Sequence, residues 1–278
     1  MERLPADTRM GPVHLTVSDL DRSLGYWGDT IGLRVRGRED GRASLGDGDE
    51  LLVLVEEPGV RPSHGHTGLF HVALLVPERR DLARFLAHAA RDGVTLTGLS
   101  DHDVSEAIYL RDPDYHGIEV YADRPRELWD GQVRERMTTR PLDVEGLLGE
   151  LEDPESEPFD GLPGGTVVGH VHFKASSIPE TVGFYRDLLG FDVTASLGDQ
   201  AAFLSAGGYH HHVGANVWES AGAPPPPPGH AALRHATIVL PTEDTRDEVV
   251  ARVGAEDSPH GPLVRDPSGN ALVLAAAE

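Results

Sequence analysis

The sequence predicts an α+β fold made of four repeated units, each a strand, a helix and two or three further strands. Two internal matches carry this prediction. Residues 19–35 (DLDRSLGYWGDTIGLRV) match residues 177–193 (SIPETVGFYRDLLGFDV), and HVALLVP at 71–77 matches HATIVLP at 235–241. A segment that recurs within one chain is the signature of a repeated structural unit. We place the four units at residues 11–57, 67–122, 168–219 and 231–275.

Units one and three begin with a strand followed by a helix. The strand-like runs are VHLTVS at 13–18 and VHFKAS at 171–176. After the first run, apolar residues recur at helical spacing: Leu20, Leu24, Trp27 and Ile31. Ser18 or Asp19 suits the helix N-cap, and Gly32 and its counterpart Gly190 suit the position just after the helix.

Units two and four end alike. Each carries Arg-Asp-Pro, at 111–113 and at 265–267, which predicts a turn. A final strand follows each turn, GIEVYA at 117–122 and NALVLA at 270–275.

The remaining segments connect the units. Residues 123–165 are rich in Pro, Asp and Glu and predict a linker with one short helix in LDVEGLLGEL. The five prolines of 224–228 predict a stiff spacer between units three and four. We therefore divide the chain into a first pair of units at 1–122, the linker, and a second pair at 166–278.

Composition limits the partners. The 278 residues carry a formal net charge of −22, which repels nucleic acid and anionic membranes, so we expect neither as a partner. The absence of cysteine from the sequence excludes disulfides and thiolate metal sites. The first residues, MERLPADTRMG, lack an apolar signal core, and we expect a cytoplasmic protein.

Three motifs carry a family resemblance: HLTVSDLDRSLGYWGDTIGL, HVHFKASSIPETVGFYRDLLGF and IYLRDPDYHGIEVY. On these the chain resembles the vicinal oxygen chelate superfamily of glyoxalases, bleomycin-resistance proteins and extradiol dioxygenases. The resemblance covers nearly all of the chain outside 123–165. It implies four βαβββ modules that form two cupped, barrel-like mixed sheets, with a metal ion held in a cup.

The resemblance implies metal ligands at a His in a module's first strand and a Glu in a module's last strand. The internal repeat shows which units keep them. Pro12 of unit one stands opposite His170 of unit three, and Glu119 of unit two stands opposite Val273 of unit four. His71 of unit two has a His counterpart in unit four.

Only units two and three together supply a 2-His-1-carboxylate set: His71, His170 and Glu119. This set is typical of non-haem Fe(II), with Mn(II) as the alternative metal. We therefore expect units two and three to share the working cup, and units one and four to form a structural partner. His235 is interpreted as structural, and His14 and His172 as residues that pack in the core or support the ligands from behind.

The resemblance also implies a non-ligand acid/base His, and GYHHHVGANVW at 208–218 is the candidate segment. Strand alternation would put His210 and His212 on one face and His211 on the other. His212 is the first choice for the acid/base and His211 the second, because imidazole changes charge near neutral pH. Tyr109 is expected beside Glu119 to hydrogen-bond a substrate oxygen. His102 is the expected supporting residue.

The resulting expectation is a catechol 2,3-dioxygenase-like enzyme of aromatic catabolism. It would act on a small aromatic diol and O2 with Fe(II), and association into a homo-oligomer is left open. Two alternatives remain: another metal-dependent enzyme of the superfamily, such as a lyase or isomerase, and a protein that only sequesters a ligand.

Overall fold

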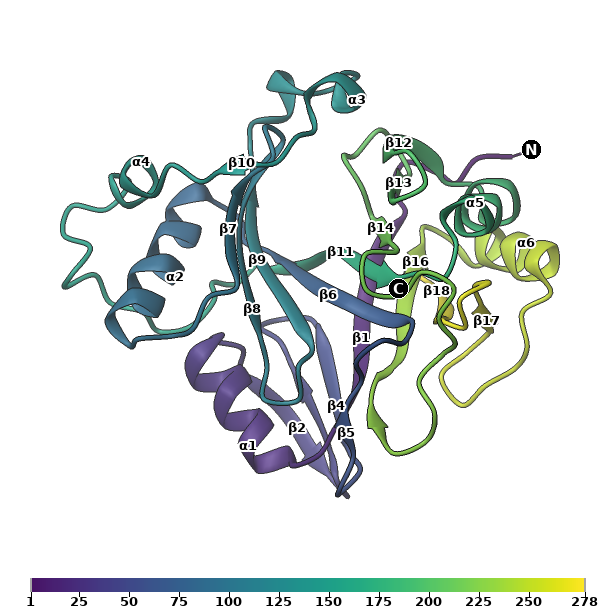
Figure 1. The fold of residues 1–278 in the computed structure, drawn as a ribbon, viewed down its shortest axis with the longest axis horizontal. Coiled ribbons are helices and arrows are strands. Elements are labelled where there is room, and N and C mark those ends of the chain that lie inside the picture. Colours follow the sequence, from purple (N-terminus) through teal and green to yellow (C-terminus); the bar gives the residue numbers. More distant parts are fainter. Residues whose placement is uncertain (1, 278) are drawn as a thin grey trace.

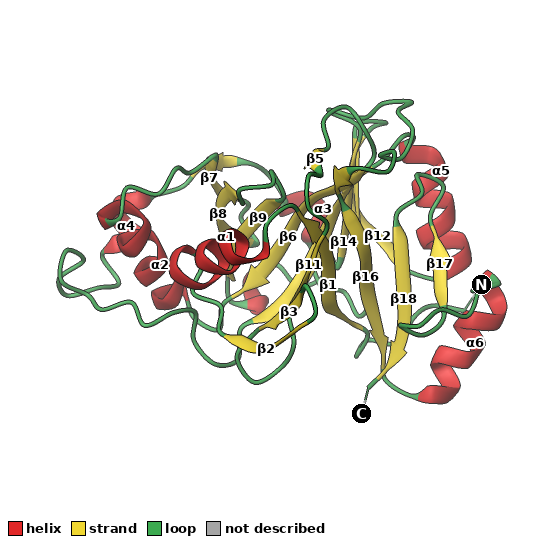
Figure 2. Cartoon of the chain, turned by 90° about the horizontal axis from the view of Figure 1, so that it is seen from below, coloured by secondary structure: helices red, strands yellow, loops and turns green. Residues whose placement is uncertain are grey.

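The computed structural model describes residues 2–277 and contains two large mixed sheets and one small one (Figures 1 and 2). The nine-stranded sheet runs β10 (Arg140–Pro141), β7 (Gly98–Asp101), β8 (Ser105–Arg111), β9 (Gly117–Asp123), β6 (Gly68–Leu75), β11 (Val167–Lys174), β14 (Val213–Asn216), β13 (Ala201–Ser205) and β12 (Asp192–Leu197). The seven-stranded sheet runs β17 (Leu263–Arg265), β18 (Ala271–Ala276), β16 (Leu233–Leu240), β1 (Arg9–Val17), β4 (Leu52–Glu56), β3 (Arg42–Leu45) and β2 (Val35–Glu39). The small sheet pairs β15 (His230–Ala231) with β5 (Arg61–Pro62).

Each large sheet joins two units through their first strands. β6 of unit two pairs antiparallel with β11 of unit three, and β1 of unit one pairs antiparallel with β16 of unit four. The sheet topology therefore confirms that units two and three share one sheet, and that units one and four share the other.

The helices flank the sheets. They are α1 (Leu20–Gly25), α2 (Arg79–Arg91), α3 (Val133–Arg136), α4 (Val144–Leu148), α5 (Ile178–Val182) and α6 (Glu243–Val253), with a 3-10 turn at Arg126–Leu128. Figure 1 shows α2 and α4 outside the arm formed by β7, β8 and β9, and α5 and α6 together on the opposite side of the molecule. None of the helices in residues 2–277 is long and apolar enough to cross a membrane.

The repeated helices begin and end at the residues that their sequences predict. Asp19 caps α1 by accepting from the Arg22 backbone N–H, and Ser177 caps α5. Both helices continue into a π-helical segment, Tyr26–Thr30 and Gly183–Leu189. Gly190 then has a φ of +96°, a left-handed conformation that favours glycine.

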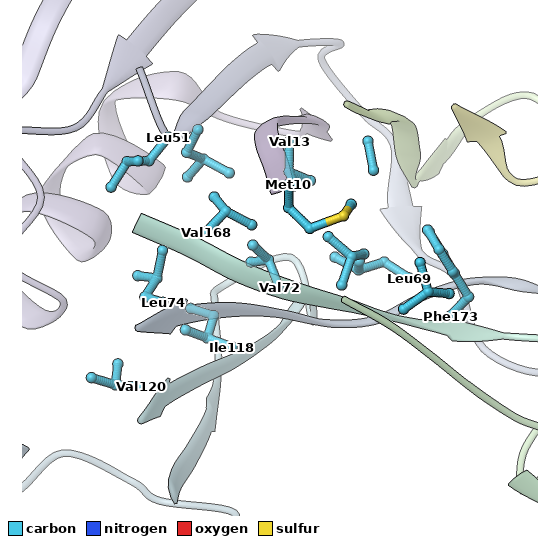
Figure 3. Packing of buried hydrophobic residues seen from close by; sticks show 14 of the residues in the cluster. Met10, Val13, Leu51, Leu69, Val72, Leu74, Ile118, Val120, Val168 and Phe173 are labelled. Carbon is cyan, nitrogen blue, oxygen red and sulfur yellow. The ribbon is translucent and has the colours of Figure 1, made fainter. Parts of the chain in front are cut away.

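The main apolar core lies between the two large sheets. Val72 and Leu74 of β6, Val120 of β9 and Val13 of β1 are buried in one cluster, and Figure 3 shows them with Phe173 of β11. Since alternate strand residues face opposite ways, this packing turns the other face of β6 and β9 towards the cup. Burying a Val or Leu side chain contributes roughly 1.5–3 kcal/mol, so the buried face fixes the register on which the site depends.

The 123–165 segment connects units two and three and also contributes a helix, a strand and cavity-lining residues. The short helix expected in LDVEGLLGEL is present as α4, capped by Asp143. Upstream of it, β10 extends the nine-stranded sheet, and Arg134, Met137, Thr138 and Thr139 line the cavity described below.

Candidate active site

The three expected ligand residues lie on three neighbouring strands around one alanine. Ala73 of β6 pairs with Glu119 of β9 on one side and with His170 of β11 on the other. His71 precedes Ala73 by two residues, so strand alternation puts it on the same face. Because Ala73 has only a methyl group, the longer side chains around it converge above it.

The ligand atoms of the triad form a compact triangle. His71 Nε2 lies 2.9 Å and His170 Nε2 lies 3.1 Å from Glu119 Oε2, and the two Nε2 atoms are 3.3 Å apart. All three side chains are buried. Residues from two sequence units thus meet at one point, as the pattern of ligands across the repeat predicted.

This triangle fits a divalent transition metal. With metal–ligand bonds of about 2.1 Å, two ligands at right angles lie about 3.0 Å apart, and two tetrahedral ligands about 3.4 Å apart. The three separations of 2.9, 3.1 and 3.3 Å are nearer to one face of an octahedron. Two imidazoles and one carboxylate in this arrangement leave positions open for substrates.

The charge state of the triad also suits a cation. Burial alone would raise the pKa of Glu119, but the His170 and His71 imidazoles outweigh burial and hold that pKa well below its usual range. Burial lowers the pKa of His170 to about 4, against the opposing effect of Glu119. At neutral pH the site is therefore a carboxylate beside a neutral imidazole, the forms that bind metals.

Packing orients His170. Its Nδ1 is buried without a hydrogen-bond partner in residues 2–277. Its ring lies 4.0 Å from the His211 ring and 4.9 Å from the Tyr121 ring, centroid to centroid. Gly169 makes this possible, since a Cβ there would collide with the Tyr121 hydroxyl.

A cavity of about 810 Å³ opens above the triad. All three ligands line it, together with aromatic and aliphatic side chains from both halves of the sheet: Phe70, Ile118, Phe203, Leu197 and Trp218. Trp218 is 52% exposed. His172, expected to pack or to support the ligands, also lines the cavity, with its Nε2 3.0 Å from Asn216 Nδ2.

Tyr109 and His102 lie together in this cavity, as expected. Tyr109 pairs with Glu119 across β8 and β9, and its hydroxyl is 2.8 Å from His102 Nε2. His102 Nδ1 lies 2.7 Å from the Thr138 carbonyl oxygen, which can only accept, so Nδ1 carries the proton. In the neutral ring Nε2 then accepts from the Tyr109 hydroxyl. Burial, reinforced by Glu119, raises the pKa of Tyr109 well above its usual value, so its hydroxyl keeps its proton.

The structure places His211, the second choice for the acid/base, in the cavity and His212, the first choice, outside it. His211 lines the cavity, whereas His212 does not, and His212 Nδ1 accepts from the Ala206 backbone N–H at 3.2 Å. The expected alternation fails because β14 begins only at Val213, and residues 206–212 form a loop. Gly207 and Gly208 in this loop have φ of +63° and +69°, left-handed conformations that favour glycine and do not occur in a regular strand.

A hydrogen-bonded chain behind His211 sets its tautomer. Asp123 Oδ1 lies 2.8 Å from His210 Nε2, and His210 Nδ1 lies 2.7 Å from His211 Nδ1. The carboxylate accepts, so His210 Nε2 donates, and its Nδ1 is then free to accept from His211 Nδ1–H. The other His211 nitrogen, Nε2, is left with a lone pair.

Sequence reasoning missed Asp123 and the role of His210. The sequence offers only a weak signal for this contact. Asp123 directly follows the predicted strand of unit two, and the His cluster lies far along the chain in unit three. Pairing β9 with β14 through two intervening strands is what brings them together.

The other large sheet does not repeat the two-His, one-Glu set at the corresponding positions of its described residues. Its central pair places His14 beside His235, with ring centroids 3.9 Å apart. Pro12 and Val273 occupy the positions that correspond to His170 and Glu119.

Comparison with known proteins agrees with the fold. The model of the Glyoxalase/Bleomycin resistance protein/Dioxygenase superfamily matches residues 9–120 and 167–274. A Bacillus subtilis protein named catechol-2,3-dioxygenase is 41% identical over 285 residues, covering 98% of this chain and 99% of the relative. A mouse glyoxalase domain-containing protein 4 is 30% identical over 114 residues, covering 38% of each chain.

Solved structures share the fold at low sequence identity. A putative dioxygenase from Bacillus subtilis superposes with a TM-score of 0.63 at 12% identity, covering 99% of this chain and 86% of the other. Glyoxalase I from Zea mays superposes with a TM-score of 0.60 at 17% identity, covering 97% and 92%. The chain belongs to the glyoxalase/bleomycin resistance protein/dioxygenase superfamily.

Proposed function

We propose that this protein is an extradiol ring-cleaving dioxygenase that uses Fe(II) and O2 to open a catechol beside its two hydroxyl groups. The observation that carries the proposal is the His71–Glu119–His170 triangle at the floor of a cavity that also holds His211 and Tyr109. The full-length similarity to a protein named catechol-2,3-dioxygenase supports it.

The proposed metal is ferrous iron, held by His71, His170 and Glu119. Bound there, it would supply open positions for the vicinal oxygens of the diol and for O2, and the electrons that make O2 reactive. Both atoms of O2 enter the product, a 2-hydroxymuconic semialdehyde type of compound, so no further reductant is consumed.

His211 is the proposed base. The Asp123–His210 chain leaves its Nε2 unprotonated, and burial lowers the pKa of His211 well below its usual value, so the ring is neutral at pH 7. Nε2 accepts a proton from a substrate hydroxyl and can return it as the ring opens.

Tyr109 is the proposed hydrogen-bond donor to a substrate oxygen. Its raised pKa keeps the hydroxyl protonated, and His102 fixes the direction of the phenol by accepting from it at 2.8 Å in the resting site. A substrate oxygen would take over that hydrogen bond, which orients the ring for attack.

The cavity favours a substituted catechol. Its volume of about 810 Å³ lies in the upper part of the roughly 300–1,000 Å³ range of small-molecule sites, more than one ring needs. Leu197 and Phe203 of the β12–β13 hairpin line it, together with Trp218 after β14. We propose that the substrate carries an apolar substituent directed towards these residues.

The test is oxygen-dependent ring cleavage. Protein loaded anaerobically with Fe(II) is mixed with catechol or an alkyl- or aryl-substituted catechol, and O2 is then admitted while visible absorbance and O2 uptake are followed. We expect a yellow product and one O2 consumed per ring, with substituted catechols preferred. Bound iron without O2 uptake would favour a non-oxygenase enzyme of the superfamily, and tight ligand binding without any metal would favour a sequestering protein.

A further inference from the structure

A second group of metal-ligating side chains lies in the seven-stranded sheet, away from the cavity. His14 of β1 and His235 of β16 are paired residues across the centre of that sheet. His260, in the turn between α6 and β17, completes the group, and one ring nitrogen from each residue lies within 4.8 Å of the others. The ring of His260 is 5.2 Å from that of His14 and 4.7 Å from that of His235, between centroids.

Two of these rings are buried. His14 is 6% exposed and His235 is 3% exposed. Their ring centroids lie 3.9 Å apart, and the exposed His260 ring packs against both. Three imidazoles whose nitrogens gather this closely form a ligand set that a metal ion can bridge.

The rings are also in the form that binds metals. Burial, reinforced by His235, lowers the pKa of His14 to about 3, and burial, reinforced by His260, lowers that of His235 to about 4. Arg42 of β3 and Arg234 of β16 act in the same direction. Arg234 is paired with Glu57 at 2.6 Å, which offsets much of its charge.

We propose that His14, His235 and His260 form a second metal site that binds a divalent transition metal of the zinc class. Three neutral imidazoles without a carboxylate suit Zn(II), Ni(II) or Cu(II) rather than Mg(II) or Ca(II). Two ligands with bonds of about 2.1 Å lie at most about 4.2 Å apart, so any two ring nitrogens farther apart than this must close on the ion. His260 lies on an exposed turn and can make that movement.

Such a site would clamp distant parts of the chain. His14 belongs to unit one, whereas His235 and His260 belong to unit four, more than 200 residues later. The metal would therefore fix β1 against β16 and hold the turn before β17 over the sheet. The internal repeat does not predict the position of His260. In unit two a hairpin that carries His102 follows the helix, whereas the strands after the helix of unit four are shorter, so His260 has no clear counterpart.

The probe is Zn(II), and the first measurement is the number of ions retained per chain. Wild type, His260→Ala, Glu119→Gln and the double variant are dialysed against Zn(II) and analysed for metal. We expect two ions for wild type, one for each single variant and none for the double. His64→Ala, which removes another exposed His outside the cluster, is the matched control and should keep two ions.

Thermal unfolding and catechol cleavage supply the second readout. With free Zn(II) at about 100 times Kd, the Glu119→Gln protein should gain roughly 5–10 °C in Tm, and the double variant should gain nothing. Fe(II)-loaded His260→Ala should cleave catechol at the wild-type rate, so this site is tested independently of the dioxygenase. The inference is overturned if wild type and His260→Ala retain the same number of Zn(II) ions.

Discussion

Replacing Asp123 with Asn tests how the catalytic tautomer is set. Asp123, His210 and His211 form a hydrogen-bonded series, in which Asp123 supplies the negative charge. Its Oδ1 lies 2.8 Å from His210 Nε2. The substitution keeps the size of the side chain but removes the charge. An amide can also donate, so His210 would no longer be forced to donate through Nε2.

The expected loss follows from hydrogen-bond energies. A hydrogen bond to a charged group contributes about 1.5–3 kcal/mol and a neutral one about 0.5–1.5 kcal/mol, a difference of about 1–1.5 kcal/mol. The Asp123 side chain is 25% exposed, which favours the lower end. Since 1.36 kcal/mol is tenfold in rate, kcat should fall about five- to tenfold.

The assay is steady-state catechol cleavage by the iron-loaded variant, with kcat and KM determined separately. We expect KM to stay near the wild-type value, because Asp123 is not among the residues that line the cavity. Tyr209→Phe is the matched control: it removes the 3.2 Å hydrogen bond to the same carboxylate but leaves the His210 contact. Unchanged kcat in Asp123→Asn, or an equal fall in both variants, would refute the tautomer reasoning.

Further predictions address the ligands, the base and pH. Ala73→Leu should fill the space in which the ligands converge and abolish iron binding, measured as iron per chain, whereas Ala73→Gly should keep it; iron retained in Ala73→Leu would contradict the geometry. His211→Ala should lower kcat about 10²- to 10⁴-fold, while His212→Ala should lower only the unfolding midpoint; the reverse order would restore His212 as the base. In the metal-free protein, His170 and His212 have folded pKa values of about 4 and about 3, below the unfolded value of 6.5, so the unfolded chain binds more protons as pH falls. Each should cost about 2 kcal/mol of unfolding free energy between pH 7 and pH 5, which denaturant titration at both pH values would measure; equal stability at both would contradict this.

The repeat made much of the fold predictable. Matching segments located all four units, and the caps and glycines placed the ends of the repeated helices. The loss of Glu at Val273 and of His at Pro12 indicated which units share a sheet, because a metal needs its ligands in one place. Strand β10 and the cavity-lining residues of 123–165 could not be predicted. This segment is rich in Pro, Asp and Glu and shows no hydrophobic period.

The site was predictable where it depends on regular strands. His71, Glu119, His170 and Tyr109 lie where two-residue alternation and strand pairing put them. The choice between His211 and His212 was not predictable in this way, because residues 206–212 form a loop and β14 starts only at Val213. Asp123, His210 and His260 make their contacts with segments distant in sequence, which no local pattern encodes.

The central claim is that one iron centre, built jointly by units two and three, carries out extradiol cleavage. The most direct measurement is single-turnover cleavage of catechol by anaerobically Fe(II)-loaded wild type, Glu119→Ala, His170→Ala and His235→Ala, with iron per chain determined on the same samples. We predict a yellow product with wild type and His235→Ala, and neither iron in the cavity nor product with Glu119→Ala and His170→Ala. Product formed by the Glu119 and His170 variants but lost in His235→Ala would contradict the account and move the reaction to the seven-stranded sheet.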